Sequence, residues 1–122
     1  MLLPDLIVHS AARAPESPAL VVAERVLAYA ELQQQVHAVA CGLVGLGLGR
    51  GERVGIYLEK RFEAVIASFA ASAAGGVFVP MNPLLKPDQV AYVARDCDVR
   101  VLVTSPERLE MLAPLLPQCT AL

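Results

Sequence analysis

The chain has 122 residues, of which 56% are hydrophobic, and a mean hydropathy of +0.53. This is enough apolar material for the core of one domain, and it excludes a disordered chain. The 10 basic and 12 acidic side chains are spread along the sequence and give a net charge of −2, so we expect no nucleic-acid partner.

The longest uncharged stretch, from Ala64 to Leu85, is long enough to raise the question of a membrane span. It contains Gly75, Gly76 and two prolines, which divide it into a helix, a strand and a turn. The segment from Met1 to Asp5 has no basic residue before its first apolar cluster and no convincing cleavage site. We therefore expect a cytoplasmic chain with no membrane span and no signal peptide.

The first part of the chain predicts a helix, a hairpin and a second, longer helix. Apolar residues at helical spacing run from Leu3 to Ala11 and end before two prolines. Ala19–Val22 is predicted to form a strand that turns at Ala23–Glu24 and returns as Arg25–Ala28. The apolar face of the long helix that follows is expected to consist of Leu32, Val36, Val39, Leu43 and Leu46.

The glycines at 45, 47 and 49 have the spacing of a dinucleotide-binding loop. Such a loop must follow a strand and open a helix, so that the amides at the start of the helix face the pyrophosphate. Here the order is reversed, because a helix precedes the glycines and the predicted strand Arg53–Leu58 follows them. We interpret these glycines as the end of the helix and a turn.

From Arg53 onward, short apolar strands alternate with helices. The predicted elements are strands at Arg53–Leu58, Val77–Val79 and Arg100–Thr104, and helices at Phe62–Ala74, Pro87–Asp96 and from Pro106 onward. This order favours an α/β fold with three layers, in which a mostly parallel sheet has helices on both faces. The predicted first helix and short β-hairpin precede this sheet.

The predicted helix starts differ in the quality of their caps. Ala28 cannot accept a hydrogen bond from the first N–H groups of the long helix, and we expect this to cost about 1 kcal/mol. Lys86 is a weak cap for the helix that begins at Pro87. Ser105 is a good cap, because it is followed by Pro106 and Glu107, which suit the first turn of a helix.

The helix Phe62–Ala74 is apolar on all sides and has no charge beyond Glu63. A helix of this kind is normally covered on both sides. Either one side is covered by a portion of chain that is absent here, or its small alanines tolerate exposure to water.

Cys41, Cys97 and Cys119 are too far apart for a metal site with Cys-x-x-Cys spacing, and their odd number argues against a disulfide framework. We expect three reduced, mostly buried thiols. The two histidines, His9 and His37, fall on predicted helices, and we do not favour a catalytic cysteine–histidine pair.

Three segments carry a resemblance to a known family. Leu27–Leu32, Ala73–Pro83 and Val99–Ser105 have the order and spacing typical of adenylate-forming enzymes. The chain resembles an AMP-forming acyl-CoA ligase from about Leu6 to Ser105, most strongly between Ala28 and Ser105, and the resemblance implies that residues 1–122 are the amino-terminal portion of the large domain. In that family Ser or Thr usually stands where Ala28 does. The runs Gly75–Lys86 and Asp96–Ser105 are especially similar to the subgroup of acyl-CoA ligases associated with exosortases.

This resemblance implies that the complete enzyme joins a carboxylate to ATP, giving an acyl-adenylate, and transfers the acyl group to coenzyme A. It also implies that ATP, Mg²⁺ and coenzyme A serve the complete enzyme, and that none is expected for this fragment. The family's phosphate-binding loop, rich in Ser, Thr and Gly, is absent here, where Thr104 and Thr120 are the only threonines. We therefore assign no catalytic, cofactor-binding or metal-binding residue, and we do not nominate Lys60, Arg61 or Lys86.

Three hypotheses of function follow. The first is an inactive amino-terminal segment whose partner is the remainder of the ligase chain, and it is favoured because Leu115–Leu122 resembles a helix end that enters another apolar segment. The second is a stand-alone protein-interaction module derived from this fold, and a homo-oligomer formed through exposed apolar surface is a related hypothesis. The third, a small flavodoxin-like nucleotide binder, lacks a phosphate loop because Leu58–Arg61 is bulky and charged.

Overall fold

The computed structural model describes all 122 residues and confirms the predicted α/β architecture. The helices are α1 (Asp5–Arg13), α2 (Tyr29–Gly45), α3 (Phe62–Ala73), α4 (Pro87–Asp96), α5 (Pro106–Leu112) and the 3-10 helix η1 (Ala113–Gln118). The strands are β1 (Pro18–Val22), β2 (Arg25–Ala28), β3 (Arg53–Tyr57), β4 (Val77–Pro80) and β5 (Val99–Thr104). Each predicted element is present, with ends that differ from the prediction by a residue or two.

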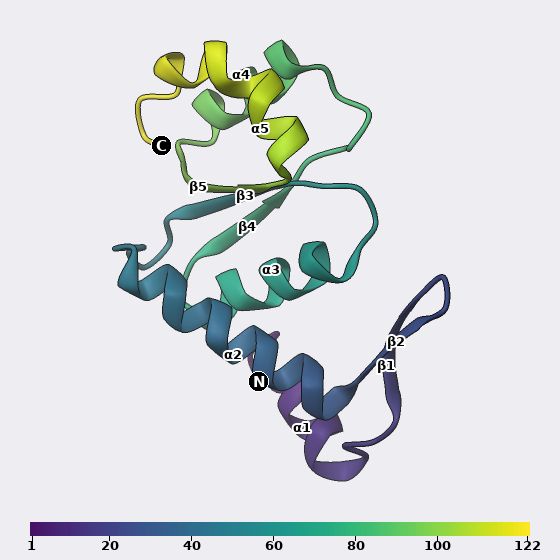
Figure 1. The fold of residues 1–122 in the computed structure, drawn as a ribbon. Coiled ribbons are helices and arrows are strands. Elements are labelled where there is room, and N and C mark those ends of the chain that lie inside the picture. Colours follow the sequence, from purple (N-terminus) through teal and green to yellow (C-terminus); the bar gives the residue numbers. More distant parts are fainter.

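The strands form two separate sheets. β1 and β2 are an antiparallel hairpin, whereas β4, β3 and β5, in this order, form a parallel sheet. α3 lies on one face of the parallel sheet, with α2 packed against it, and α4 and α5 lie on the other face, so the molecule has three layers (Figure 1). The hairpin extends from the α1–α2 end of the molecule, away from the parallel sheet (Figure 1).

Each face of the parallel sheet has its own hydrophobic core. The larger core joins α1, α2 and α3 to the sheet through residues such as Val36, Val54 and Ile66. The smaller core joins α4, α5 and the end of the chain to the opposite face through Tyr57, Val90 and Leu112. Burial on both faces explains why the strands are short apolar runs rather than alternating ones.

The apolar helix α3 is covered mainly by the chain itself. It packs between α2 and the sheet, with Phe62, Ile66 and Ala70 buried in the larger core. Val65 and Phe69 are half-buried, and Ala73 at the end of the helix is exposed. No separate layer is therefore needed to cover most of this helix.

The predicted apolar face of α2 needs two corrections. Leu32, Val36 and Leu43 are buried as expected, but Val39 is exposed, because Ala40 takes the core position one residue later. Leu46 lies beyond the end of α2 and is 69% exposed.

The glycines after α2 end the helix, as predicted. Gly47 has φ +94°, a left-handed conformation that favours glycine. Its N–H donates to the Val44 carbonyl, and the N–H of Leu48 donates to the Leu43 carbonyl. This pair of bonds is the Schellman motif, which satisfies the last carbonyls of a helix.

At Gly76 the absence of a side chain allows the backbone of Glu52 to approach closely. A Cβ at this position would lie 2.9 Å from the Glu52 carbonyl oxygen, a separation too short for two non-bonded atoms. The space is closed because Val77 N–H donates to the same carbonyl, which holds the start of β4 against the start of β3. Any larger residue at 76 must therefore separate these segments.

The caps of α2, α4 and α5 agree with the sequence prediction, and α2 and α4 each have one further hydrogen bond at their start. Ser105 Oγ accepts a hydrogen bond from Arg108 N–H at 3.3 Å, which confirms it as the cap of α5. At Lys86 and Ala28 the side chain accepts no bond, but their N–H groups donate to Gln89 and Glu31 side chains at 2.8 and 3.4 Å. These two helix starts thus keep one half of a capping box.

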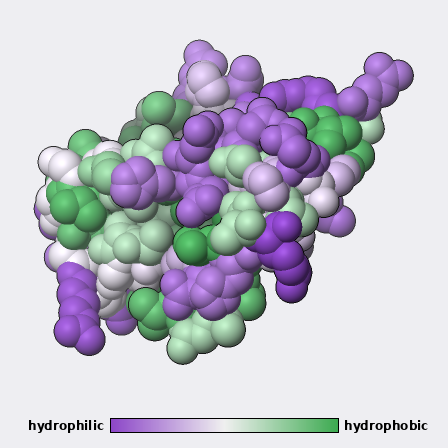
Figure 2. Space-filling model, turned by 90° about the horizontal axis from the view of Figure 1, so that it is seen from below, coloured by the Kyte–Doolittle hydropathy of each residue, from purple (hydrophilic) through white to green (hydrophobic).

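The surface mixes polar and apolar side chains. Seen from the α1–α2 side, hydrophobic residues are scattered among hydrophilic ones (Figure 2). None of the helices is both long enough and apolar enough to cross a membrane.

Candidate functional site

The candidate site is the carboxyl edge of the parallel sheet. In open α/β sheets, ligands bind beside the carboxyl ends of strands, where successive connections leave toward opposite faces. Here β3 leads to α3 on one face and β4 leads to α4 on the other, so the two strands form such a point. The side chains that gather there come from the β3–α3 loop, the β4–α4 loop and α5.

Two carboxylates and one arginine occupy the β3–α3 connection. Arg61 Nε donates to Glu63 Oε2 at 2.7 Å, and Arg61 Nη1 donates to Glu59 Oε1 at 3.2 Å. The hydrogen bond with Arg61 holds the pKa of Glu63 below its usual value, and Glu63 in turn raises the pKa of Arg61. All three side chains are substantially exposed, so water weakens these pairs.

Arg108 joins the three connections at this edge. Its Nε donates to Glu59 Oε2 at 3.2 Å, and its Nη1 donates to the Pro83 carbonyl at 2.9 Å. Its guanidinium carbon lies 4.4 Å from the centroid of the Tyr57 ring, within the range of a cation–π contact. The Arg108 side chain is only 17% exposed, so water screens its contacts less, and we expect them to stabilise the fold more than those of Arg61.

Two further hydrogen bonds hold the edge in place. The Tyr57 hydroxyl donates to the Leu85 carbonyl at 2.6 Å, and the Thr104 hydroxyl donates to the Tyr57 carbonyl at 2.8 Å. Glu59 has a lowered pKa because its carboxylate accepts from its own backbone N–H and from Arg108 and Arg61. The edge is therefore a set of paired groups that fasten loops together.

The chemistry available at this edge is limited. Both carboxylates are paired with arginines and have lowered pKa values, so neither is suited to exchange protons near neutral pH. No group of three or more potential metal ligands lies close together in the molecule. The hydrogen bonds of Arg108, Tyr57 and Thr104 make the carboxyl edge a structural clamp between these loops.

The structure places the basic residues that the sequence left unassigned. Arg61 is held by the two glutamates, and Lys86 stands at the start of α4. Lys60 is exposed in the β3–α3 loop. The prediction that no residue here is catalytic or binds a cofactor or a metal stays a prediction.

The cysteines correct one expectation. Cys119 is buried and Cys97 half-buried, but Cys41 is exposed on α2, where a buried thiol was expected. Its Sγ lies 3.7 Å from Nε2 of His37, which is one helical turn earlier. The spacing of four residues on a predicted helix was the signal for this pair, although both side chains are exposed and no further polar group completes a catalytic arrangement.

Sequence reasoning missed the role of Arg108. This residue lies 49 positions from Glu59 and 25 from Pro83, so no local pattern connects them. Only the parallel sheet brings them together. The sequence offered one indirect signal, namely that Arg108 lies in the first turn of the helix that follows β5.

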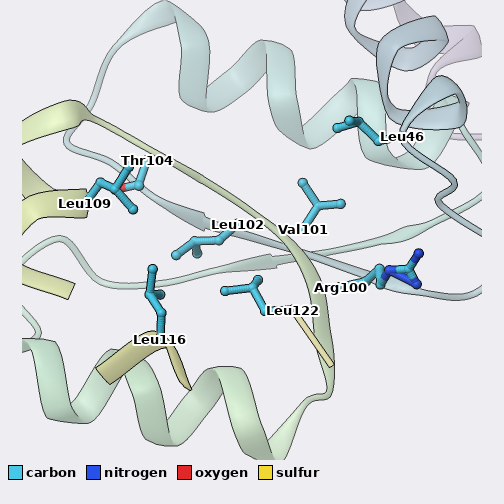
Figure 3. Close-up of a pocket in the computed structure, with 8 residues that line it drawn as sticks. All are labelled: Leu46, Arg100, Val101, Leu102, Thr104, Leu109, Leu116 and Leu122. Carbon is cyan, nitrogen blue, oxygen red and sulfur yellow. The ribbon is translucent and has the colours of Figure 1, made fainter. Parts of the chain in front are cut away.

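An apolar groove runs along β5, which is an outer strand of the sheet. It has a volume of about 420 Å³ and is lined by Leu46, Arg100, Val101, Leu102, Thr104, Leu109, Leu116 and Leu122. Leu46 and Val101 lie on one side of the strand, Leu116 and Leu122 on the other, and Arg100 and Thr104 at opposite ends (Figure 3).

Comparison with known proteins identifies relatives across nearly the whole chain. The family model described as "AMP-binding enzyme" matches residues 7–121. A medium/long-chain fatty-acid and 3-oxocholest-4-en-26-oate CoA ligase of Mycobacterium marinum is 29% identical over 113 residues, which are 93% of this chain and 20% of the relative. A ligase of L-proline with the L-prolyl-carrier protein, from Pseudomonas fluorescens, is 31% identical over 112 residues, which are 92% of this chain and 22% of that protein.

Solved structures share the fold as well. The anthranilate CoA ligase AuaEII, solved with anthranoyl-AMP, superposes with a TM-score of 0.94 and 27% identity. The superposition covers 100% of this chain and 24% of that ligase. The chain thus spans less than a quarter of the length of each of these relatives.

Proposed function

Because this chain belongs to the AMP-binding enzyme family, we propose that residues 1–122 are the amino-terminal portion of the large domain of an AMP-forming acyl-CoA ligase. The observation that carries this proposal is the superposition of the whole chain, with all three layers, on 24% of a CoA ligase. The likeness to a fatty-acid CoA ligase along 93% of the chain supports the same class.

The proposed reaction activates a carboxylate. A carboxylate is too electron-rich for a thiol to attack, and joining it to AMP, with release of pyrophosphate, supplies a good leaving group. The thiol of coenzyme A then displaces AMP and leaves an acyl thioester. ATP and Mg²⁺ are thus the proposed requirements of the first step, and coenzyme A is that of the second.

The residues present do not fit a nucleotide. A triphosphate needs backbone N–H groups on a small-residue loop, or free lysines and arginines. The loop after β3 instead carries Glu59, whose negative charge would oppose phosphate, and Arg61, which is already engaged by two carboxylates. We therefore place the nucleotide, Mg²⁺ and catalytic groups of the proposed enzyme in sequence outside these residues.

The test uses the complete ligase to which residues 1–122 are proposed to belong, called the longer protein below. It measures carboxylate-dependent exchange of pyrophosphate into ATP. The proposal expects exchange with at least one acid from a panel of fatty and aromatic acids, and formation of the acyl thioester when coenzyme A is added. Exchange without thioester would favour a carrier protein as the acyl acceptor, as the name of the L-proline ligase states for that relative. Absence of exchange with every acid would refute the proposal.

Two finer parts of the proposal concern the subgroup of the ligase and its cellular location. Membership of the exosortase-associated subgroup is supported by the runs Gly75–Lys86 and Asp96–Ser105 alone. An exosortase gene beside the gene for this chain would support it, and a ligase gene in a genome without exosortases would argue against it. A cytoplasmic location also stays a proposal, which fluorescence microscopy of the tagged protein would test.

A further inference from the structure

A histidine and a cysteine on the outer side of α2 form a pair of side chains that zinc binds in other proteins. His37 Nε2 lies 3.7 Å from Cys41 Sγ, and both residues are exposed. α2 is on the outside of its helical layer, so the pair faces solvent (Figure 1). Neither residue belongs to a hydrophobic core or to the clamp at the carboxyl edge. The pair is therefore accessible to an ion from solution.

The distance between the two atoms matches the spacing of two ligands on one zinc ion. Zinc binds cysteine sulfur at about 2.3 Å and histidine nitrogen at about 2.0–2.1 Å, with tetrahedral angles. These lengths place the sulfur and the nitrogen about 3.6 Å apart, and the structure has them at 3.7 Å. Zn²⁺ thus fits between Nε2 and Sγ in place of their hydrogen bond, once the thiol has given its proton to solvent.

The surroundings of the pair carry no positive charge that would repel a cation. α2 contains no lysine or arginine, and its one carboxylate, Glu31, lies in the first turn. A groove of about 320 Å³ lies beside the pair. Its other lining residues are uncharged and, except for one valine, are alanines: Ala40, Val44, Ala73 and Ala74.

One copy of the chain supplies only half of a zinc site. Zinc in proteins has four ligands in structural sites and three protein ligands in catalytic sites. No group of three potential ligands lies close together in a single copy. Two copies that present His37 and Cys41 to the same ion would supply two imidazoles and two thiolates, which is a complete tetrahedral set.

The exposed side of α2 leaves room for a second copy. Gly42 and Gly45 flank Cys41 on this side, and a Cβ at either position would meet no atom within 4 Å. Helices approach most closely where the side chains between them are small. We propose that His37 and Cys41 of two copies bind one Zn²⁺ ion between their α2 helices, and that zinc thereby joins two copies into a dimer. This inference is independent of the proposed function.

Sedimentation with and without zinc, in a reducing buffer, tests the proposal on the 122-residue chain and on the longer protein. We expect monomers without metal, dimers that hold one Zn²⁺ per two chains, and a return to monomers when EDTA is added. Co²⁺ in place of Zn²⁺ should give the near-ultraviolet absorption of a cobalt–thiolate bond and the intense visible bands of tetrahedral coordination. One ion per chain without dimers, or no zinc binding by the longer protein, would overturn the proposal.

Substitutions at the pair separate metal binding from other causes of association. His37→Ala and Cys41→Ser should abolish the zinc-dependent dimer and leave the Tm of the metal-free chain unchanged, because both side chains are exposed. His9→Ala and Cys97→Ser are the matched controls and should keep the dimer. Cys41→His should also keep it, since imidazole is a zinc ligand, but without the cobalt–thiolate absorption. A zinc dimer that survives both His37→Ala and Cys41→Ser would show that the ion binds elsewhere and would refute the proposal.

Discussion

Ala28→Ser should stabilise the chain, because it completes the capping box of α2. Ala28 has the extended backbone of a helix cap, with φ −76° and ψ 160°. Its N–H already donates to the Glu31 side chain at 3.4 Å, so the reciprocal bond is the part that is missing. A serine Oγ at 28 would accept from the backbone N–H of Glu31.

The expected gain is smaller than the full value of a cap. The N–H groups of Tyr29 and Ala30 are already satisfied by the carbonyls of Ser17 and Pro15, each at 3.1 Å. Only one amide is left to gain, so we expect about 0.5–1 kcal/mol, the lower part of the range for caps. With an unfolding entropy of about 0.26 kcal/mol/K for 122 residues, this raises the Tm by about 2–4 °C.

Differential scanning calorimetry of the wild-type and variant chains measures this shift. Ser105→Ala is the matched control, since it removes an existing cap and should lose about 1 kcal/mol. An unchanged or lower Tm for Ala28→Ser, together with a clear loss for Ser105→Ala, would show that the N–H groups at the start of α2 gain nothing from a serine at 28, contrary to this prediction.

Three further predictions concern the carboxyl edge and the glycines. Arg108→Ala should lower the free energy of unfolding in urea by about 1–3 kcal/mol, because it removes the cation from the face of the buried Tyr57 ring and the donor of the Pro83 carbonyl. The exposed Arg61→Ala should lower it by no more than about 1 kcal/mol. Because the folded state lowers the pKa of Glu59, its stabilising effect is present above about pH 4.3 and is lost as the pH falls through the lowered pKa. Glu59→Gln should accordingly flatten the fall of the urea midpoint below that pH, and an unchanged slope would count against the ion pairs. Gly76→Ala should lower the free energy of unfolding by about 1–3 kcal/mol, because its Cβ would clash with the Glu52 carbonyl. Gly42→Ala, on an open face of α2, should raise it by up to about 1 kcal/mol. Equal effects of the two substitutions would contradict the close packing at Gly76.

The fold was predictable from local signals because these signals agree with one another. The strand from Arg53 and the helix Pro87–Asp96 are bounded by glycines, prolines and charged residues, so their ends are visible in the sequence. The Ser105 cap and the helix end before Gly47 depend on residues within a few positions of each other. Interactions of such short range can be read without knowledge of the tertiary structure.

What the sequence did not reveal depends on packing between distant elements. The choice of Ala40 rather than Val39 for the core depends on which side of α2 packs against α3, and no periodicity of α2 alone distinguishes them. The clamp of Arg108 on Tyr57 depends on which strands are neighbours in the sheet. The groove beside β5 likewise exists only because β5 is an outer strand.

Calorimetric titration of the purified 122-residue chain with ATP and Mg²⁺, beside the same titration of the complete ligase, measures whether residues 1–122 hold the nucleotide. We expect saturable binding by the complete ligase and no binding heat from the 122-residue chain, because we place the groups that hold the nucleotide outside residues 1–122. Saturable binding of ATP by the 122-residue chain itself would contradict it.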